Sequence, residues 1–331
     1  MEDQEILLKK IRQLTTKNGI YQHGKHGEPD PQFGYALEDQ ARALIVAHCF
    51  GAKDLEKIYL NFIIRAQNKN TFLNQYYYDD QRGFVEDATP FTVLDRQEAY
   101  GITFWALFAT NHFQDQKIKP LVDRLCKNAY SWVSPRAIAA ALLGLSCLPV
   151  QSPLEKELTE KMRQFYQKVA TEDWQWFENY LTYANGILPW ACWEISLSRK
   201  DKEMEKIADN TTKFLIDTCQ TNGIPTPIGN QGWYKKGGEK AVFDQQPIDA
   251  AYMVCCLEKA YLSTKNKFYL DWAKKWWEWF WGNNINKISL IDRDGACYDS
   301  LNKEGVNLNQ GAESNICFLM AFLAAKRLNL D

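Results

Sequence analysis

Apolar residues recur along most of the chain at spacings of three and four, which is the period of an α-helix with one buried face. This periodicity predicts twelve helices and an all-α protein. The predicted helices cover residues 3–16, 36–50, 54–68, 94–110, 116–130, 135–147, 154–170, 179–196, 203–219, 244–262, 266–281 and 310–327.

The predicted helices are of two alternating kinds. Odd-numbered helices such as 154–170 carry one apolar stripe, here with Leu154, Leu158 and Met162, which is typical of an outer helix. Even-numbered helices such as 135–147 and 310–327 are apolar nearly all round and rich in small residues. Such helices are buried on most sides, so outer and inner helices alternate six times.

The connections also alternate in length. Most connections from an outer helix to the next inner helix are long, and they cover residues 17–35, 69–93, 171–178, 220–243 and 282–309. Long loops in compact domains are usually functional. We therefore expect an (α/α)6 toroid of six helical hairpins, with an active-site cleft on the long-loop face. No linker-like stretch divides the chain, so a single domain over residues 1–331 is predicted.

Composition and charge limit the possible partners and cellular location of the protein. Lys and Arg number 39 and Asp and Glu 41, so the net charge of −2 gives no basic excess for nucleic acid. The first residues lack a secretory signal, and the longest nearly apolar run, 137–150, is too short for a membrane span. The nine cysteines form no C-x-x-C pair and lie mostly in apolar runs. These features predict a cytoplasmic protein without disulfides, bound metal, cofactor, or nucleic-acid or membrane partners.

Aromatic residues are frequent, with 12 Trp, 16 Tyr and 17 Phe among 331 residues. Most of them are expected to fill the core. A carbohydrate-binding cleft is the other use of such residues, because flat rings stack on the apolar faces of sugars.

Each inner helix begins with a cluster of polar residues, and several of the preceding loops carry aromatic residues. Single Asp, Asn or Ser residues there, such as Asp244 or Asn309, could be helix caps. Capping does not explain why arginines and tryptophans accompany them. The residues predicted to bind a substrate are Glu38, Arg42, Arg96, Arg136, Trp174, Trp176, Tyr183, Asn185, Trp233, Tyr234, Gln245, Gln246, Asn309, Gln310 and Glu313.

Acidic residues at these positions point to glycoside chemistry. Cleavage of a glycosidic bond needs one protonated carboxyl group as acid and one ionised carboxylate that activates water or attacks directly. Glu178, which follows Trp174, Trp176 and Phe177, is the first choice for the acid. For the base, Asp244 and Asp95 rank together, ahead of Asp39.

Other chemistries have little support in the sequence. The histidines are His23, His26, His48 and His112; a metal site at His23 and His26 is disfavoured, and His48 reads as a core residue. The sequence has no G-x-S-x-G, no P-loop and no G-x-G-x-x-G after a strand.

Five motifs resemble those of the six-hairpin glycosidase-like domain that bacteria encode beside, or fused to, glycosyltransferases. They begin at Glu38, Trp174, Gly229, Phe243 and Val306, and the resemblance covers about residues 33–327. It implies an (α/α)6 fold, an oligosaccharide or glycan ligand, and a glycosyltransferase as a further partner. Two positions depart from the pattern: Asp95-Arg-Gln-Glu stands where Asp-Ser-x-Gly-Arg is expected, and Glu38-Asp39 where two aspartates are expected.

Three functions remain open at this point. The leading hypothesis is a glycoside hydrolase that acts on an oligosaccharide. A sugar phosphorylase or isomerase on the same fold is the second, because arginines begin three inner helices; no histidine lies in the motifs to serve an isomerase as base. The third is a non-catalytic glycan-binding partner of a glycosyltransferase.

Overall fold

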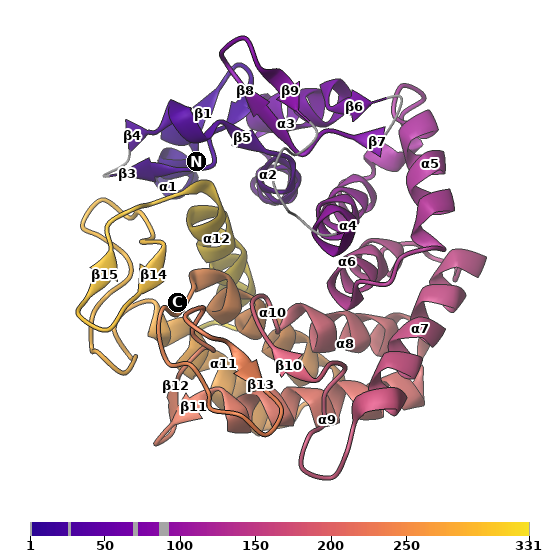
Figure 1. Cartoon of the computed structure of the whole chain (residues 1–331), viewed down its shortest axis with the longest axis vertical. Coiled ribbons are helices and arrows are strands. Elements are labelled where there is room, and N and C mark those ends of the chain that lie inside the picture. Colours follow the sequence, from indigo (N-terminus) through magenta and orange to yellow (C-terminus); the bar gives the residue numbers. More distant parts are fainter. Residues whose placement is uncertain (1, 26–27, 69–71, 86–92, 331) are drawn as a thin grey trace. The chain divides into compact units, whose positions relative to one another are not determined.

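The computed structural model describes residues 2–25, 28–68, 72–85 and 93–330. Within these ranges the chain forms twelve α-helices (Figure 1), which confirms the all-α prediction. Their bounds are α1 Glu2–Leu14, α2 Leu37–Phe50, α3 Lys53–Arg65, α4 Val93–Ala109, α5 Lys119–Ala129, α6 Pro135–Leu145, α7 Pro153–Val169, α8 Ile187–Arg199, α9 Lys202–Thr218, α10 Pro247–Thr264, α11 Lys267–Trp279 and α12 Ala312–Arg327.

Two inner helices begin three or more residues later than predicted. Helix α8 begins at Ile187 instead of 179, because Ala184 adopts a positive φ of 52° and residues 180–181 pair as a strand. Helix α10 begins at Pro247 instead of 244, since proline is favoured in the first turn and Gln246 takes the N-cap position. Asp244 is therefore not the cap of α10. At α6, Ser134 is an N-cap whose side chain accepts a hydrogen bond from the Ala137 amide.

Burial agrees with the predicted alternation of inner and outer helices. All eleven residues of α6 are buried, and so are most residues of α2 and α10. In α3 and α5, by contrast, the buried residues form a single stripe. The small residues of the inner helices allow close packing: a Cβ on Gly101 in α4 would lie 2.6 Å from the Ala137 carbonyl oxygen in α6.

Short antiparallel strands, which periodicity did not predict, occupy the long loops. They pair as β1 with β2, β3 with β4, β5 with β8, β8 with β9, β6 with β7, β10 with β13, β11 with β12 and β14 with β15. Their bounds are β1 Thr15–Thr16, β2 Gly19–Ile20, β3 Gly24–Lys25, β4 Glu28–Pro29, β5 Tyr35–Ala36, β6 Gln67–Asn68, β7 Phe72–Leu73, β8 Tyr76–Tyr78, β9 Gly83–Val85, β10 Tyr180–Leu181, β11 Gln220–Thr221, β12 Ile224–Pro225, β13 Tyr234–Lys235, β14 Ser300–Leu301 and β15 Val306–Asn307. Two short 3₁₀ helices, η1 Pro31–Phe33 and η2 His112–Gln114, lie in the described loops.

Contacts within the chain define two compact units. Unit 1 comprises Met1–Leu158 and Asn309–Ile316, and unit 2 comprises Thr159–Leu308 and Cys317–Asp331. In unit 1, α2 packs against α3 and α4, and α4 packs against α6 (Figure 1). In unit 2, α8 packs against α9 and α10, and α10 packs against α11. The single domain and the cleft on the long-loop face stay predictions.

Large aromatic side chains fill the interior of each unit. Phe104 and Trp132 are fully buried in unit 1, and Trp193, Trp276 and Trp279 are fully buried in unit 2. The core function predicted for most aromatic residues is thus confirmed for these five. None of the described helices combines the length and the hydrophobicity that a membrane span requires.

Candidate functional site

In unit 2, strands β10 and β13 bring two of the predicted motifs together. Tyr180 pairs with Lys235 and Leu181 with Tyr234. The Lys236 amide extends the pairing by donating to the Asn179 carbonyl oxygen at 2.9 Å. The loop that carries Glu178 therefore lies against the loop that carries Trp233 and Tyr234.

The second of these loops is joined by backbone hydrogen bonds to the segment that precedes α10. The amides of Gly229, Asn230 and Gln231 donate to the carbonyl oxygens of Ala241, Asp244 and Phe243 at 2.9, 3.0 and 3.1 Å. A Cβ on Gly229 would lie 2.2 Å from the Phe243 carbonyl oxygen, so only glycine allows this close approach. The motif Gly229-Asn-Gln is thus explained by the way it holds Asp244.

Asp244, a predicted catalytic residue, is half-buried. Its Oδ2 accepts a hydrogen bond from Gln231 Nε2 at 3.2 Å. Its Oδ1 is shielded from solvent and has no hydrogen-bond partner among the residues that the structure describes. Leaving a buried acceptor unsatisfied costs about 1–3 kcal/mol of folding free energy, and such atoms are often found at functional sites.

Glu178, the predicted acid, is also half-buried, and its backbone oxygen accepts a hydrogen bond from Trp174 Nε1 at 2.7 Å. The Trp174 ring is 3% exposed and contacts Tyr234 and Phe214. Trp176 is fully buried against Phe214. These two tryptophans have the placement of core side chains, and their function in binding a sugar stays a prediction.

Trp233, Tyr234 and Tyr183 are the partly exposed aromatic residues among those predicted to bind a substrate in unit 2, and Trp233 and Tyr183 lie close to each other. Their ring centroids lie 6.0 Å apart with an interplanar angle of 52°. Trp233 has a positive φ of 59°, which is uncommon for a bulky residue and is more frequent at functional sites. Their placement next to the Asp244 loop is compatible with the predicted stacking on a sugar.

Three further predicted residues of unit 2 have hydrogen bonds within the protein. Both ends of the buried Gln245 side chain are used: Nε2 donates to the Val242 carbonyl oxygen, and Oε1 accepts from Trp279 Nε1. Gln246 is the half-buried N-cap residue of α10. Asn185 is buried, and its backbone amide donates to Asp249 Oδ1 at 3.2 Å.

Asp249 was missed by sequence reasoning as a residue that holds the site. It is 4% exposed in the first turn of α10, and through Asn185 it fixes the loop that follows Glu178. Its position two residues after Pro247 made it look like an ordinary first-turn acid.

In unit 1, Arg42 gathers three carboxylates. Its Nη1 lies 3.2 Å from Asp39 Oδ1 and 3.0 Å from Glu313 Oε2, and its Nη2 lies 3.9 Å from Glu38 Oε2. Arg42 and Asp39 are 5% and 3% exposed, whereas the side chains of Glu38 and Glu313 are each 38% exposed. Asp39 is paired with Arg42 and buried, which leaves little access for a substrate.

The starts of α4 and α6 form a second polar group in unit 1. Ser134 Oγ donates to Glu98 Oε1 at 2.8 Å, and Gln97 Oε1 accepts from the amides of Val133 and Ser134. Arg96 is half-buried and Arg136 is buried at the first turns of these helices. Asp95 lies in α4, but its side chain is outside the described residues, so its predicted catalytic function stays a prediction.

Asn309 and Gln310 lie against residues 22–25, which include strand β3. Asn309 and Lys25 pair in an isolated antiparallel β-bridge. The Gln310 amide donates to the Gly24 carbonyl oxygen at 2.7 Å, and the Ala312 amide donates to the Gln22 carbonyl oxygen at 3.0 Å. His23, between those two acceptors, thereby lies next to the start of α12. The sequence analysis considered His23 only as a metal ligand, because its neighbours at α12 are almost 290 positions away in the chain.

The other described histidines lie elsewhere. His48 Nδ1 and His112 Nε2 both lie near Glu56 Oε1, at 3.1 and 3.0 Å. His48 is in the last turn of α2, roughly 14 Å along the helix from Asp39 at 1.5 Å per residue. His48 is thus half-buried and paired with Glu56 instead of being a core residue, and His26 is outside the described residues.

Among the described residues, the potential metal ligands and the buried cysteines give no support to metal or thiol chemistry. No group of three or more His, Cys, Asp or Glu residues there is arranged to hold a metal ion. All nine cysteines are free thiols, and six of them are buried. Burial raises the pKa of Cys219 and Cys256 to about 12, so these thiols are protonated and poor nucleophiles at neutral pH.

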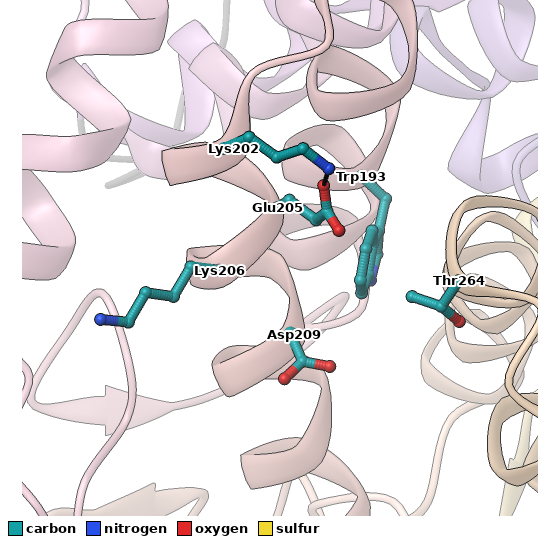
Figure 2. A pocket seen from close by; sticks show the side chains of 6 residues that line it. All are labelled: Trp193, Lys202, Glu205, Lys206, Asp209 and Thr264. Atoms are coloured by element: carbon teal, nitrogen blue, oxygen red, sulfur yellow. Dashed lines mark hydrogen bonds and ion pairs between the residues drawn. The ribbon is translucent and has the colours of Figure 1, made fainter.

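A groove of about 340 Å³ lies on the outer side of unit 2, between α8, α9 and α10 (Figure 2). Its lining residues are Trp193, Lys202, Glu205, Lys206, Asp209 and Thr264, and they include none of the predicted site residues. Lys202 pairs with Glu205 at 2.7 Å, and Asp209 pairs with Lys213 at 2.7 Å. Because no predicted site residue lines the groove, it is separate from the candidate site.

No protein-family model and no curated protein matches this sequence. Solved structures do match it over nearly its whole length. A D-mannose isomerase has a TM-score of 0.72 at 12% identity, covering 98% of this chain and 96% of that chain. Cellobiose 2-epimerase from Bacillus thermoamylovorans has a TM-score of 0.73 at 13% identity, covering 97% and 98%.

The GH76A α-1,6-mannanase from Salegentibacter has a TM-score of 0.66 at 11% identity, covering 99% of each chain. At such low identity these likenesses show the fold. The chain has the (α/α)6 toroid fold that the helix pattern and the motifs predicted. The link to glycosyltransferases stays a prediction.

Proposed function

We propose that this protein is a carbohydrate-active enzyme that hydrolyses a glycosidic bond in an oligosaccharide, with Glu178 as acid and Asp244 as the ionised carboxylate. The observation that carries the proposal is the setting of Asp244. One of its oxygens is held by Gln231, and the other is buried without a partner among the described residues. A water molecule or a substrate hydroxyl would supply the missing hydrogen bond.

The surroundings of Asp244 support a sugar as the ligand. Trp233 and Tyr183 hold partly exposed rings next to the same loop, and Glu178 lies in the segment paired with it through β10 and β13. The solved structures of similar fold include an isomerase, an epimerase and a mannanase, which are named for sugar substrates. Because one fold can host several chemistries, the proposal rests on the residues and not on the fold.

In the proposed reaction the glycosidic C–O bond breaks as Glu178 transfers its proton to the leaving oxygen. If Asp244 acts as base, it takes a proton from water while the water oxygen bonds to the anomeric carbon. If Asp244 acts as nucleophile, its oxygen forms that bond first, and water later hydrolyses the glycosyl–enzyme ester. The anomeric configuration of the first product, followed by NMR, distinguishes these two routes.

A hydrolysis screen tests the proposal. The purified protein is incubated with gluco-, manno- and galacto-oligosaccharides, with and without phosphate, and the products are separated by chromatography. Release of a monosaccharide or shorter oligosaccharide in either buffer would support the hydrolase. A sugar phosphate formed only with phosphate would indicate a phosphorylase instead.

If no product forms from any oligosaccharide of the panel, the protein does not hydrolyse these sugars. If the same sugars still raised the melting temperature of the protein, a glycan-binding protein without catalytic activity would be the better account.

Sugar isomerisation or epimerisation is the second candidate function, because His23 lies next to the start of α12. Its neighbours Gln22 and Gly24 accept hydrogen bonds from Ala312 and Gln310, close to the pair of Glu313 and Arg42. A histidine can take a proton from the carbon next to a sugar carbonyl group. The motifs contain no histidine, but the fold brings His23 close to one of them. The lack of a motif histidine is therefore a weaker argument against an isomerase or epimerase than it was from the sequence alone.

Incubation of mannose, glucose and cellobiose in D2O tests this second function. Proton abstraction would give an isomerised product that carries solvent deuterium, with no glycosidic bond cleaved, and His23→Asn should abolish it. Unlabelled, unchanged sugars after prolonged incubation would exclude this activity for these substrates.

A further inference from the structure

We infer that Gln231 is a positioning residue for Asp244: its side-chain amide holds one carboxylate oxygen, Oδ2, so that Oδ1 is the oxygen that reacts. This inference rests on the proposed function of Asp244. Gln231 is absent from the residues that the sequence analysis selected, although it lies in the Gly229 motif.

The hydrogen bonds assign different functions to the two oxygens of Asp244. Gln231 Nε2 donates to Oδ2 at 3.2 Å, whereas Oδ1 is buried and has no partner in the described parts of the chain. A carboxylate held at one oxygen cannot rotate freely, so the direction of its second oxygen is fixed. The amide nitrogen can only donate a hydrogen bond, so Oδ2 is engaged as its acceptor.

The fold of the loop does not depend on the Gln231 side chain. Backbone hydrogen bonds from Gly229, Asn230 and Gln231 already join the loop to residues 241–244. Within the loop, the Trp233 amide donates a hydrogen bond to the Gly229 carbonyl oxygen. The Gln231 side chain is exposed apart from its bond to Asp244. A purely structural function would therefore leave little effect when the side chain is changed.

Two substitutions of Gln231 separate the effect of adding a charge beside Asp244 from the effect of removing the hydrogen-bond donor. Gln231→Glu keeps the size of the side chain but places a second carboxylate beside Oδ2, and like charges disfavour the ionised form of Asp244. Gln231→Leu removes the donor without adding charge. Gln167→Glu is the matched control, because Gln167 is an exposed residue of unit 2 that also donates its amide to a carboxylate, that of Glu203.

The experiment measures kcat and KM from pH 4 to pH 9 for the wild type and these variants, on the substrate found in the screen. We expect Gln231→Glu to move the acidic limb of the kcat profile to higher pH by at least half a unit. We expect Gln231→Leu to lower kcat about 10- to 100-fold with KM changed less than threefold, which is less than most of the roughly 10²- to 10⁴-fold contribution of the acid or base itself. Gln167→Glu should match the wild type.

Two results would overturn the inference. If Asp244→Asn is inactive but the pH profile and kcat of both Gln231 variants coincide with those of the wild type, Gln231 does not position Asp244. If Asp244→Asn keeps full activity, the proposed function of Asp244 fails and the inference fails with it. Melting temperatures within 2 °C of the wild type, measured in parallel, would show that neither result comes from unfolding.

Discussion

Arg42 is a charged residue that is packed in the interior of unit 1. Its guanidinium is nearly inaccessible to solvent, yet it contacts Asp39 and Glu313 directly and lies near Glu38. The sequence predicted Arg42 as a substrate-binding residue. Its burial and its three acidic neighbours favour a different function, which is to hold those acids in place.

Replacement of Arg42 by Met should therefore destabilise unit 1. The change removes the Arg42 guanidinium from beside the buried Asp39 carboxylate, and breaking a buried pair in this way costs about 3–5 kcal/mol. Urea denaturation followed by circular dichroism measures the loss. Arg293→Met is the control, because Arg293 is exposed and should change stability by less than about 0.5 kcal/mol. An Arg42→Met protein as stable as the control would show that the ion pairs contribute little.

Glu56 gives a prediction for the dependence of stability on pH. Burial opposes its ionisation, but hydrogen bonds from Lys53, His48 and His112 outweigh burial and lower its pKa below the ordinary value of 4.5 for a glutamate. Its contribution to stability is therefore complete above about pH 4.5 and is lost as the pH falls through the lowered value. Between pH 6 and pH 3 the wild type should lose more stability than Glu56→Gln. Parallel stability curves for the two proteins would contradict this account.

The sequence allowed some of the candidate residues to be predicted, and the reason is physical. Asp244, Glu178 and Trp233 stand in short motifs at the starts of inner helices, where loops carry function. Gln231, Asp249 and His23 gain their significance only from contacts with distant residues. Those contacts depend on how the loops fold back, which no local pattern encodes.

At the scale of elements, helices and loops differ in how well the sequence predicts them. The twelve helices follow from a strong period of apolar residues, and most predicted bounds lie within three residues of the observed ones. Most strands such as β10 and β13 contain only two residues, too few for an alternating pattern. The pairing of β10 with β13 is nevertheless what brings the Glu178 loop to the Trp233 loop.

Gly229 tests whether the close approach of two loop segments forms the site. Gly229→Ala would place a Cβ about 2 Å from the Phe243 backbone, so the loop must shift and Asp244 with it. We expect a loss of stability of about 1–3 kcal/mol and a larger relative loss of activity. Thermal unfolding and kcat measure the two effects.

Gly305→Ala is the control for Gly229→Ala, since a Cβ there meets nothing within 4 Å. Equal melting temperatures and equal rates for the two alanine variants would mean that the tight contact at Gly229 does not matter.

At the scale of the whole molecule, the fold persists while the sequence diverges. Identity to the isomerase, the epimerase and the mannanase is only 11–13%, yet each match covers nearly the entire chain. An apolar period and small residues in the inner helices suffice to specify such a fold. Substrate and reaction depend on a few side chains in the loops, which is why the fold was predicted more fully than the chemistry.

In the proposed function, Glu178 and Asp244 together cleave a glycosidic bond. The most direct measurement is the initial rate of sugar release by Glu178→Gln and Asp244→Asn, compared with the wild type on the same oligosaccharide. Glu172→Gln and Asp294→Asn are the matched controls, because both acids are exposed and lie in unit 2.

We predict that each active-site variant loses at least about 100-fold in kcat, the scale of acid–base catalysis, while the controls keep the wild-type rate. Full activity of both Glu178→Gln and Asp244→Asn on a confirmed substrate would contradict the account.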